Sequence, residues 1–247
     1  MNRWLFDLGN SRLKCARLYD DGRLGEVIAL AHDETMFVET LREVLPGRAD
    51  SACLASVASP TLTAAVVDAL TARFRRISLA RSSMQLAGVR IAYAEPARLG
   101  VDRFLALLAA HARGSGPWLI AGVGTALTID LLDGEGLHRG GRIGPSPRLM
   151  REALQHAATQ LPAQGGSYRE FAVDTADALA SGCEGAALGL IERSLRQAEQ
   201  ALGKAPTLLL HGGGADALAS HLPAALRAPS LVLEGLALWS RAGTATL

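Results

Sequence analysis

The feature that most constrains the fold is a strand–turn–strand unit that occurs twice in the 247-residue chain. The first copy is an apolar run at residues 4–6 that leads into the turn sequence DLGNS at residues 7–11. The second copy is an apolar run at residues 118–121 that leads into GVGTA at residues 122–126. Each copy continues into two more apolar runs separated by a turn, which predicts a three-stranded meander. An internal repeat of this length predicts two similar lobes.

The remainder of the chain is predicted to be mostly helical. Apolar residues recur there at three- and four-residue intervals, as they do on the buried face of a helix. These segments cover residues 34–45, 60–74, 98–112, 147–160, 175–202 and 215–226, and a short buried strand is expected at residues 207–210. The stretch GSGP at residues 114–117 has the composition of a linker. We therefore expect an α/β protein of two lobes, residues 1–115 and 116–247.

Charge and hydropathy exclude several classes of protein. The formal net charge of +1 provides no field that would attract nucleic acid or an anionic membrane. The most apolar stretches, residues 61–70 and 104–112, are too short to span a bilayer, and the N-terminus has no signal-peptide pattern. A cytoplasmic location is expected.

The chain also contains no GxxxxGK[ST] motif and no GxGxxG after a strand, which excludes P-loop and Rossmann nucleotide sites.

Both repeated turns have the composition of a phosphate-binding loop. Small residues let backbone N–H groups approach phosphate oxygens, and hydroxyl groups add further donors. Asp7 is placed to bind a hydrated Mg²⁺ ion, as carboxylates at nucleotide sites do. The alternative is that Asp7 is an ordinary turn carboxylate, but the second copy of the turn favours phosphate binding. The candidate ligands are Gly9, Asn10, Ser11 and Lys14 in the first copy, and Gly124 and Thr125 in the second.

Two further clusters are candidates for substrate contacts. Gly212, Gly213 and Gly214 follow the strand at residues 207–210, where bare backbone would admit a flat adenine or ribose; such turns also serve topology alone. Asp102 and Arg103 lie at the expected start of a helix, where the carboxylate suits a general base and the guanidinium suits an anion clamp. The alternative is that Asp102 is only a helix N-terminal charge that pairs with Arg103 at the surface.

In this order, the motifs resemble those of the type III pantothenate kinases, a family that includes the Bvg accessory factors. The resemblance runs along nearly the whole chain. DLGNS with Lys14 resembles the first phosphate motif of the family, and GTALTID at residues 124–130 resembles the second. The motifs that resemble the remaining family patterns are Tyr93 with Gly100, Val101, Asp102 and Arg103, then Gly140, Gly141, Ile143 and Pro145, Thr159 to Pro162, Thr175 with Gly182, Gly212 with Gly213, and residues 233–236.

The resemblance implies two actin-like (ribonuclease H-like) lobes, each with a mixed sheet and flanking helices, and an ATP cleft between them. It implies ATP-dependent phosphorylation of pantothenate to 4'-phosphopantothenate, the first step of coenzyme A biosynthesis, with Mg²⁺ and a monovalent cation (K⁺ or NH₄⁺). It further implies a homodimer and Asp102 as the catalytic base. The implied pantothenate contacts are Tyr93, Gly100, Val101, Asp102, Arg103 and Thr175.

The chain departs from the family pattern most seriously at Gly122. The family has at this position an aspartate that supports the monovalent cation, and glycine offers no side chain to replace it. Smaller departures are Ser146, where the family has glycine, and His211, where the family has a hydroxyl residue. The sequence therefore leaves a second hypothesis open. In it, the chain is a weakened or inactive relative that binds nucleotide or pantothenate as an accessory or sensing protein.

Overall fold

A computed structural model describes residues 1–32 and 36–242. The chain forms two compact units, one made of Met1–Arg113 with the segment from Ser230 onward, the other of Gly114–Pro229. The boundary between Arg113 and Gly114 falls at the start of the stretch expected to be a linker, residues 114–117. The end of the chain differs from the expected lobe of residues 116–247, because helix α7 (Leu231–Ala242) packs on helix α3 (Val101–His111) and on the sheet of the first unit.

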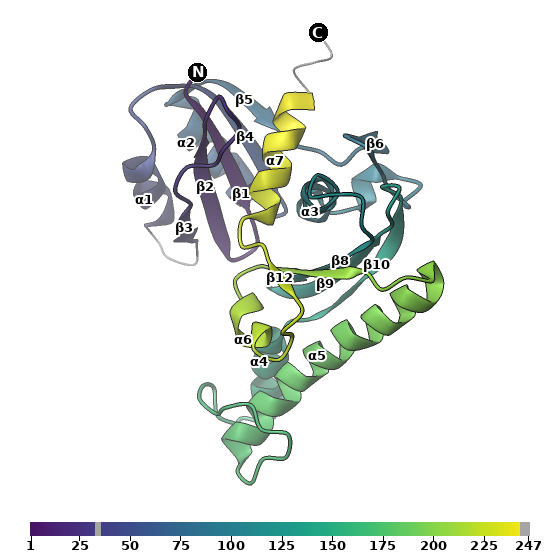
Figure 1. The fold of residues 1–247 in the computed structure, drawn as a ribbon. Coiled ribbons are helices and arrows are strands. Elements are labelled where there is room, and N and C mark those ends of the chain that lie inside the picture. The colour runs from purple at the N-terminus through teal and green to yellow at the C-terminus, as the bar shows by residue number, and fades with distance from the viewer. Residues whose placement is uncertain (33–35, 243–247) are drawn as a thin grey trace. The chain divides into compact units, whose positions relative to one another are not determined.

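The first unit contains a mixed five-stranded sheet in the order β3-β2-β1-β4-β5 (Figure 1). The central strand β1 pairs antiparallel with β2, which pairs antiparallel with β3. On its other side β1 pairs parallel with β4, and β4 pairs parallel with β5. The strand bounds are β1 Arg3–Leu8, β2 Arg12–Leu18, β3 Ile28–Ala31, β4 Ala49–Ser56 and β5 Phe74–Leu79.

The second unit repeats this topology strand for strand, in the order β10-β9-β8-β11-β12. Strands β8, β9 and β10 form the antiparallel meander, and β11 and β12 continue the sheet in parallel from β8. The bounds are β8 Trp118–Val123, β9 Ala126–Leu132, β10 His138–Pro145, β11 Thr207–His211 and β12 Leu226–Arg227. The repeat seen in the sequence therefore extends from the hairpin to the whole sheet.

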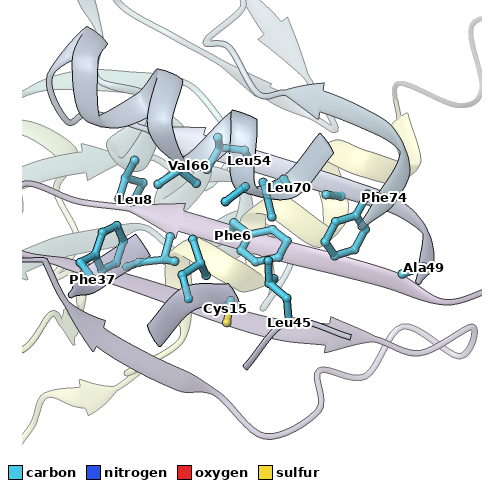
Figure 2. Close-up of a cluster of buried hydrophobic side chains, with 14 residues drawn as sticks. Phe6, Leu8, Cys15, Phe37, Leu45, Ala49, Leu54, Val66, Leu70 and Phe74 are labelled. Atoms are coloured by element: carbon cyan, nitrogen blue, oxygen red, sulfur yellow. The ribbon is translucent and has the colours of Figure 1, made fainter. Parts of the chain in front are cut away.

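One face of the first sheet is covered by helices α1 (Phe37–Val44) and α2 (Pro60–Thr71), which enclose an apolar cluster around Phe6 (Figure 2). Neighbouring residues of a strand point to opposite faces. Asp7 therefore belongs to the other face, where α3 and α7 contact the sheet. Helices α3 and α7 approach closely at Gly235, which has no side chain. A Cβ atom at this position would lie 1.9 Å from the Leu105 carbonyl oxygen.

In the second unit, helix α5 (Thr175–Leu202) and the short helix α6 (Ala215–Ala219) pack on one face of the sheet. Asp174 begins α5 by accepting hydrogen bonds from the next helical N–H groups, and Gly203 ends it in the left-handed conformation. Helix α4 (Pro147–Ala157) packs on α5. The remaining elements are the strands β6 (Gln85–Leu86) and β7 (Val89–Arg90), which pair in the first unit, and the 3₁₀ turn Pro96–Arg98.

Some expected elements differ in extent. The helix expected at residues 215–226 ends at Ala219 and continues only as turns to Leu222, the residue before Pro223, where helical backbone is disfavoured. The helix expected from residue 34 begins at Phe37, and residues 33–35 lie outside the described part of the chain. The sequence pattern does not predict strands β4 and β5. Within residues 1–32 and 36–242, no helix combines the length and the apolar character needed to cross a bilayer.

Candidate active site

The first repeated turn presents Asp7 between two neighbouring strands. Asp7 on β1 pairs with Lys14 on β2 and with Ala55 on β4, so these three side chains share one face of the sheet. The turn is closed by a hydrogen bond of 3.0 Å from Gly9 N to Arg12 O. His32 Nε2 lies 2.9 Å from the Gly9 carbonyl oxygen and donates to it, since a carbonyl can only accept.

Asp102 and Arg103 lie in the first turn of α3, as expected. The Asp102 Oδ1 atom accepts a hydrogen bond of 2.8 Å from the Arg103 backbone N–H. Gly100 precedes the helix, and a Cβ atom there would lie 2.6 Å from Asp102 Oδ1. Glycine at this position therefore leaves room for the carboxylate to fold back over the helix N-terminus.

Arg103 is buried rather than at the surface, with an exposed fraction of 7%. Its Nη1 donates a hydrogen bond of 3.3 Å to the Tyr93 hydroxyl, and its guanidinium lies 5.9 Å from the centre of the Tyr93 ring. A buried guanidinium that holds a tyrosine is suited to a fixed anion-binding role. The structure thus brings Tyr93, Gly100, Asp102 and Arg103 into one cluster at the start of α3.

The Asp102 cluster lies close to the first turn. Burial, with a smaller contribution from the nearby Asp102 carboxylate, raises the pKa of Asp7 to about 7, while Lys14 acts in the opposite direction. Two carboxylates that repel each other beside a lysine favour the arrival of a cation. The described residues contain no group of three or more potential metal-ligating side chains. Carboxylate oxygens are ligands that Mg²⁺ prefers, so Asp7 is a residue that could hold a hydrated Mg²⁺ ion whose coordination phosphate oxygens complete.

The second repeated turn is one residue shorter than the first, because Gly122 pairs with Thr128 where Asp7 pairs with Lys14. Gly124 N donates a hydrogen bond of 2.9 Å to Ala126 O, which closes the turn. The Thr125 carbonyl accepts a hydrogen bond of 2.8 Å from the Ser146 hydroxyl.

Ser146 connects this turn to the helix that follows. The residue is buried, and its hydroxyl oxygen also accepts a hydrogen bond of 3.2 Å from Leu149 N at the start of α4. The sequence identifies Ser146 only as a departure from the family pattern. Its two hydrogen bonds show that it fixes the Thr125 carbonyl to the N-terminus of α4.

The glycine turn after β11 lies against the base of the second turn. Gly212 has a φ of 95°, and a Cβ atom there would lie 2.4 Å from the Val123 carbonyl oxygen. Gly214 N donates to the same oxygen at 2.9 Å. The fold therefore requires glycine at position 212, and it places this backbone beside Val123, the residue that precedes Gly124.

Gly122 lies in β8 between Thr128 on β9 and His211 on β11. A Cβ atom at position 122 would lie 2.7 Å from His211 Nε2 and 2.8 Å from Thr128 Oγ1. The space that a carboxylate would need is therefore filled by an imidazole and a hydroxyl. These residues do not fit a monovalent cation that is held by a side chain at position 122.

The other expected ligands are placed as follows. Asn10 is exposed and Ser11 is half-buried in the first turn, and Thr175 is the exposed first residue of α5. Their proposed contacts remain predictions. Sequence reasoning missed His32, whose contact with Gly9 depends on the return of the chain along β3. Thr128 was identified only as part of the second phosphate motif, and its place beside Gly122 follows from strand register.

Solved structures show the class of this fold. A Baf family protein from Campylobacter jejuni matches with a TM-score of 0.63 and 20% identity, covering 98% of this chain and 99% of that chain. A protein from Sinorhizobium meliloti, described as a 2-dehydro-3-deoxygalactonokinase, matches with a TM-score of 0.59 and 15% identity, covering 99% and 100%. The two mixed sheets with flanking helices are those of the actin-like ATPases and kinases. The fold predicted for each lobe is confirmed.

Sequence comparison narrows this class. The family profile described as type III pantothenate kinase matches residues 4–197. A type III pantothenate kinase from Stenotrophomonas maltophilia (strain K279a) is 59% identical over 240 residues, covering 97% of this chain and 98% of that protein. One from Xanthomonas axonopodis pv. citri is 54% identical over 245 residues, covering 99% of both. The chain belongs to the type III pantothenate kinase family.

Proposed function

We propose that this chain phosphorylates pantothenate to 4'-phosphopantothenate with ATP, the step that begins coenzyme A biosynthesis. Family membership supports the reaction. The single structural observation that carries it is the closeness of Asp7, Lys14 and Asp102 in the first unit. These side chains supply a carboxylate for a hydrated metal, a cation for phosphate and a candidate base for the acceptor hydroxyl.

Asp102 is the proposed general base. Its carboxylate would accept the proton of the primary hydroxyl of pantothenate while the hydroxyl oxygen attacks the terminal phosphorus of ATP and ADP leaves from the opposite side. The N-terminus of α3 favours negative charge at this position, and Gly100 leaves the carboxylate its space. Arg103 and Tyr93, held together by their hydrogen bond, would orient the acceptor. We retain Thr175, Gly100 and Val101 as proposed substrate contacts.

The two repeated turns are proposed phosphate-binding elements. In the first, backbone N–H groups and hydroxyls at Gly9 to Ser11, with Lys14, would bind phosphate oxygens. Asp7 would hold Mg²⁺ through water; when bound, this ion supplies neutralising charge on the phosphate oxygens. In the second unit, Gly124 and Thr125 would bind phosphate. Gly212 and Gly213 would offer bare backbone to the nucleoside.

We also propose a homodimer, as the family resemblance implies. Apolar side chains that are fully exposed support this proposal. Phe171 and Val173, in the segment before α5, are 96% and 102% exposed, and α4 has no buried residue. Exposed apolar groups of this kind mark surfaces that associate. Light scattering coupled to gel filtration would show twice the 25.9 kDa mass of the chain, whereas a monomer would reject the proposal.

The test of function is a coupled assay of ADP release by the purified protein with ATP and Mg²⁺. We expect ADP release that depends on pantothenate and is not supported by a pantothenate analogue that lacks the primary hydroxyl. The assay is run with K⁺, with NH₄⁺ and with neither. ATP-induced thermal stabilisation without any pantothenate-dependent turnover would instead indicate a binding protein.

A further inference from the structure

The two sheets of the molecule provide an internal comparison for Gly122. In the first unit, the central strand supplies the carboxylate of Asp7, and its parallel neighbour supplies only the methyl group of Ala55. In the second unit the arrangement is reversed. The central strand supplies no side chain at Gly122, and its parallel neighbour supplies the imidazole of His211. The polar side chain at this level of the sheet thus lies on the central strand in the first unit and on its parallel neighbour in the second.

Space, not backbone conformation, accounts for glycine at position 122. Gly122 is not among the described glycines that have positive φ, so an L-residue could adopt its backbone. A Cβ atom would, however, lie 2.7 Å from Nε2 and 3.0 Å from Cε1 of His211. These atoms are the far end of the imidazole ring. The ring therefore lies over Gly122, and glycine in a strand interior commonly marks such a close approach.

The imidazole also lies at the junction of the two loops proposed to bind nucleotide in the second unit. His211 directly precedes Gly212, whose backbone packs on Val123, and Val123 lies between Gly122 and Gly124. The His211 side chain is half-buried, and the residue is the last of β11. An imidazole at this place can offer a ring N–H donor, whereas a carboxylate can only accept.

We propose that His211 is a nucleotide-positioning residue of the second turn, and that its imidazole over Gly122 makes this turn independent of a monovalent cation. The inference rests on the proposed function, because it assigns the second turn to ATP. A carboxylate at position 122 would bring a negative charge toward the phosphates and would require a cation beside it. The imidazole brings no negative charge, and its N–H can bind an oxygen directly.

Two readouts test the proposal, ATP-induced thermal stabilisation and the steady-state rate. Each is measured with choline, K⁺ or NH₄⁺ as the only monovalent cation. For the unmodified protein, we expect the steady-state rate, and likewise the rise in melting temperature that ATP causes, to differ by less than about twofold between the three salts. A tenfold or greater dependence of the rate or of the affinity for ATP on K⁺ or NH₄⁺ would overturn the proposal.

Variants of the Gly122–His211 pair distinguish a role of His211 in positioning ATP from a role in the folding of the protein. His211→Ser should raise the KM for ATP by about tenfold, the loss of one hydrogen bond to a charged group, with little change in the KM for pantothenate. His211→Asn retains an N–H donor and should recover most of this loss. Gly122→Ala should act like His211→Ser, because the added methyl group displaces the ring. Equal ATP affinity in His211→Ser, His211→Asn and the unmodified protein would reject the role of His211.

The double variant Gly122→Asp with His211→Ser provides the converse test. With the ring removed, the carboxylate has space, and ATP binding should become dependent on K⁺ or NH₄⁺. Unfolding of each variant without ligand shows whether it is folded. If the unmodified protein forms no phosphopantothenate in any salt, the proposed function fails, whereas the ATP-binding measurements still decide the role of His211.

Discussion

The carboxylates of Asp7 and Asp102 lie close enough for the charge of Asp102 to raise the pKa of Asp7, on top of the larger effect of burial. The two residues come from distant parts of the chain, β1 and the start of α3. Lys14 offsets part of their repulsion. Without ligand, the two carboxylates of the site thus repel each other, and a bound cation would reduce this repulsion. Several predictions of the proposed mechanism depend on this pair.

Replacing Asp102 removes the proposed base. Asp102→Asn should lower kcat by about 10²–10⁴-fold, the usual contribution of a general base, while ATP-induced thermal stabilisation is retained. Steady-state kinetics and thermal shift measure the two effects. Asp68→Asn, an exposed carboxylate on α2, is the control and should behave like the unmodified protein. A fully active Asp102→Asn enzyme would show that another group accepts the proton.

The raised pKa of Asp7 predicts a pH-dependent effect on stability. The folded protein holds this proton up to about pH 7, whereas the unfolded chain releases it near the ordinary value of 3.8. Since the folded state binds more protons between these values, the contribution of Asp7 to the free energy of unfolding falls as the pH rises.

Asp7→Asn removes this effect. Without nucleotide, the variant should unfold at a higher temperature than the unmodified protein at about pH 8, by several degrees, and the difference should be less than about half as large at about pH 5. Calorimetry at both pH values measures the difference. The same shift at both values would show that Asp7 is not protonated in the folded protein. The variant should also lose its dependence on Mg²⁺ for ATP binding.

Arg103 is predicted to bind the acceptor through its fixed guanidinium. Arg103→Lys keeps the charge but loses the planar geometry that holds Tyr93, so the KM for pantothenate should rise by about tenfold or more. The KM for ATP should change little. Arg98→Lys is the matched control, because Arg98 is largely exposed and pairs with Glu95 at the surface. Equal effects of the two variants would remove Arg103 from the substrate site.

Gly235 is predicted to be essential for the packing of α7 on α3. Gly235→Ala should destabilise the protein by about 1–3 kcal/mol, as overpacking does, because its Cβ would meet the Leu105 backbone. Gly189→Ala, in the exposed part of α5 with open space around the new methyl group, should instead be neutral or stabilising. Chemical denaturation measures both. A neutral Gly235→Ala would contradict the described contact.

Much of the fold could be predicted because the repeated hairpins carry strong local signals. Alternating apolar residues and Gly-bearing turns indicate the meanders, and the long periodic pattern of α5 was predicted with its observed bounds, Thr175–Leu202. Strand β4 was missed because its sequence ADSACLAS is rich in small residues with weak strand preference. Its place is set by pairing with β1 and β5, which local sequence does not encode.

In the candidate site, too, local sequence predicts the residues but not the contacts between them. Local motifs identified Asp7, Lys14 and Asp102, but their mutual closeness follows from the packing of α3 on the sheet. The contact between Gly122 and His211 depends on the parallel register of β8 and β11, which are separated by most of the second unit. The sequence shows two separate departures from the family, whereas the structure places these two residues in contact.

The most direct test of the central claim is mass spectrometry of the product formed by the purified protein from ATP, Mg²⁺ and pantothenate. We predict a product heavier than pantothenate by one phosphoryl group, formed at a rate that falls sharply in Asp102→Asn. The result that would contradict the account is unmodified pantothenate after prolonged incubation in K⁺, NH₄⁺ and choline, with protein that is folded and binds ATP.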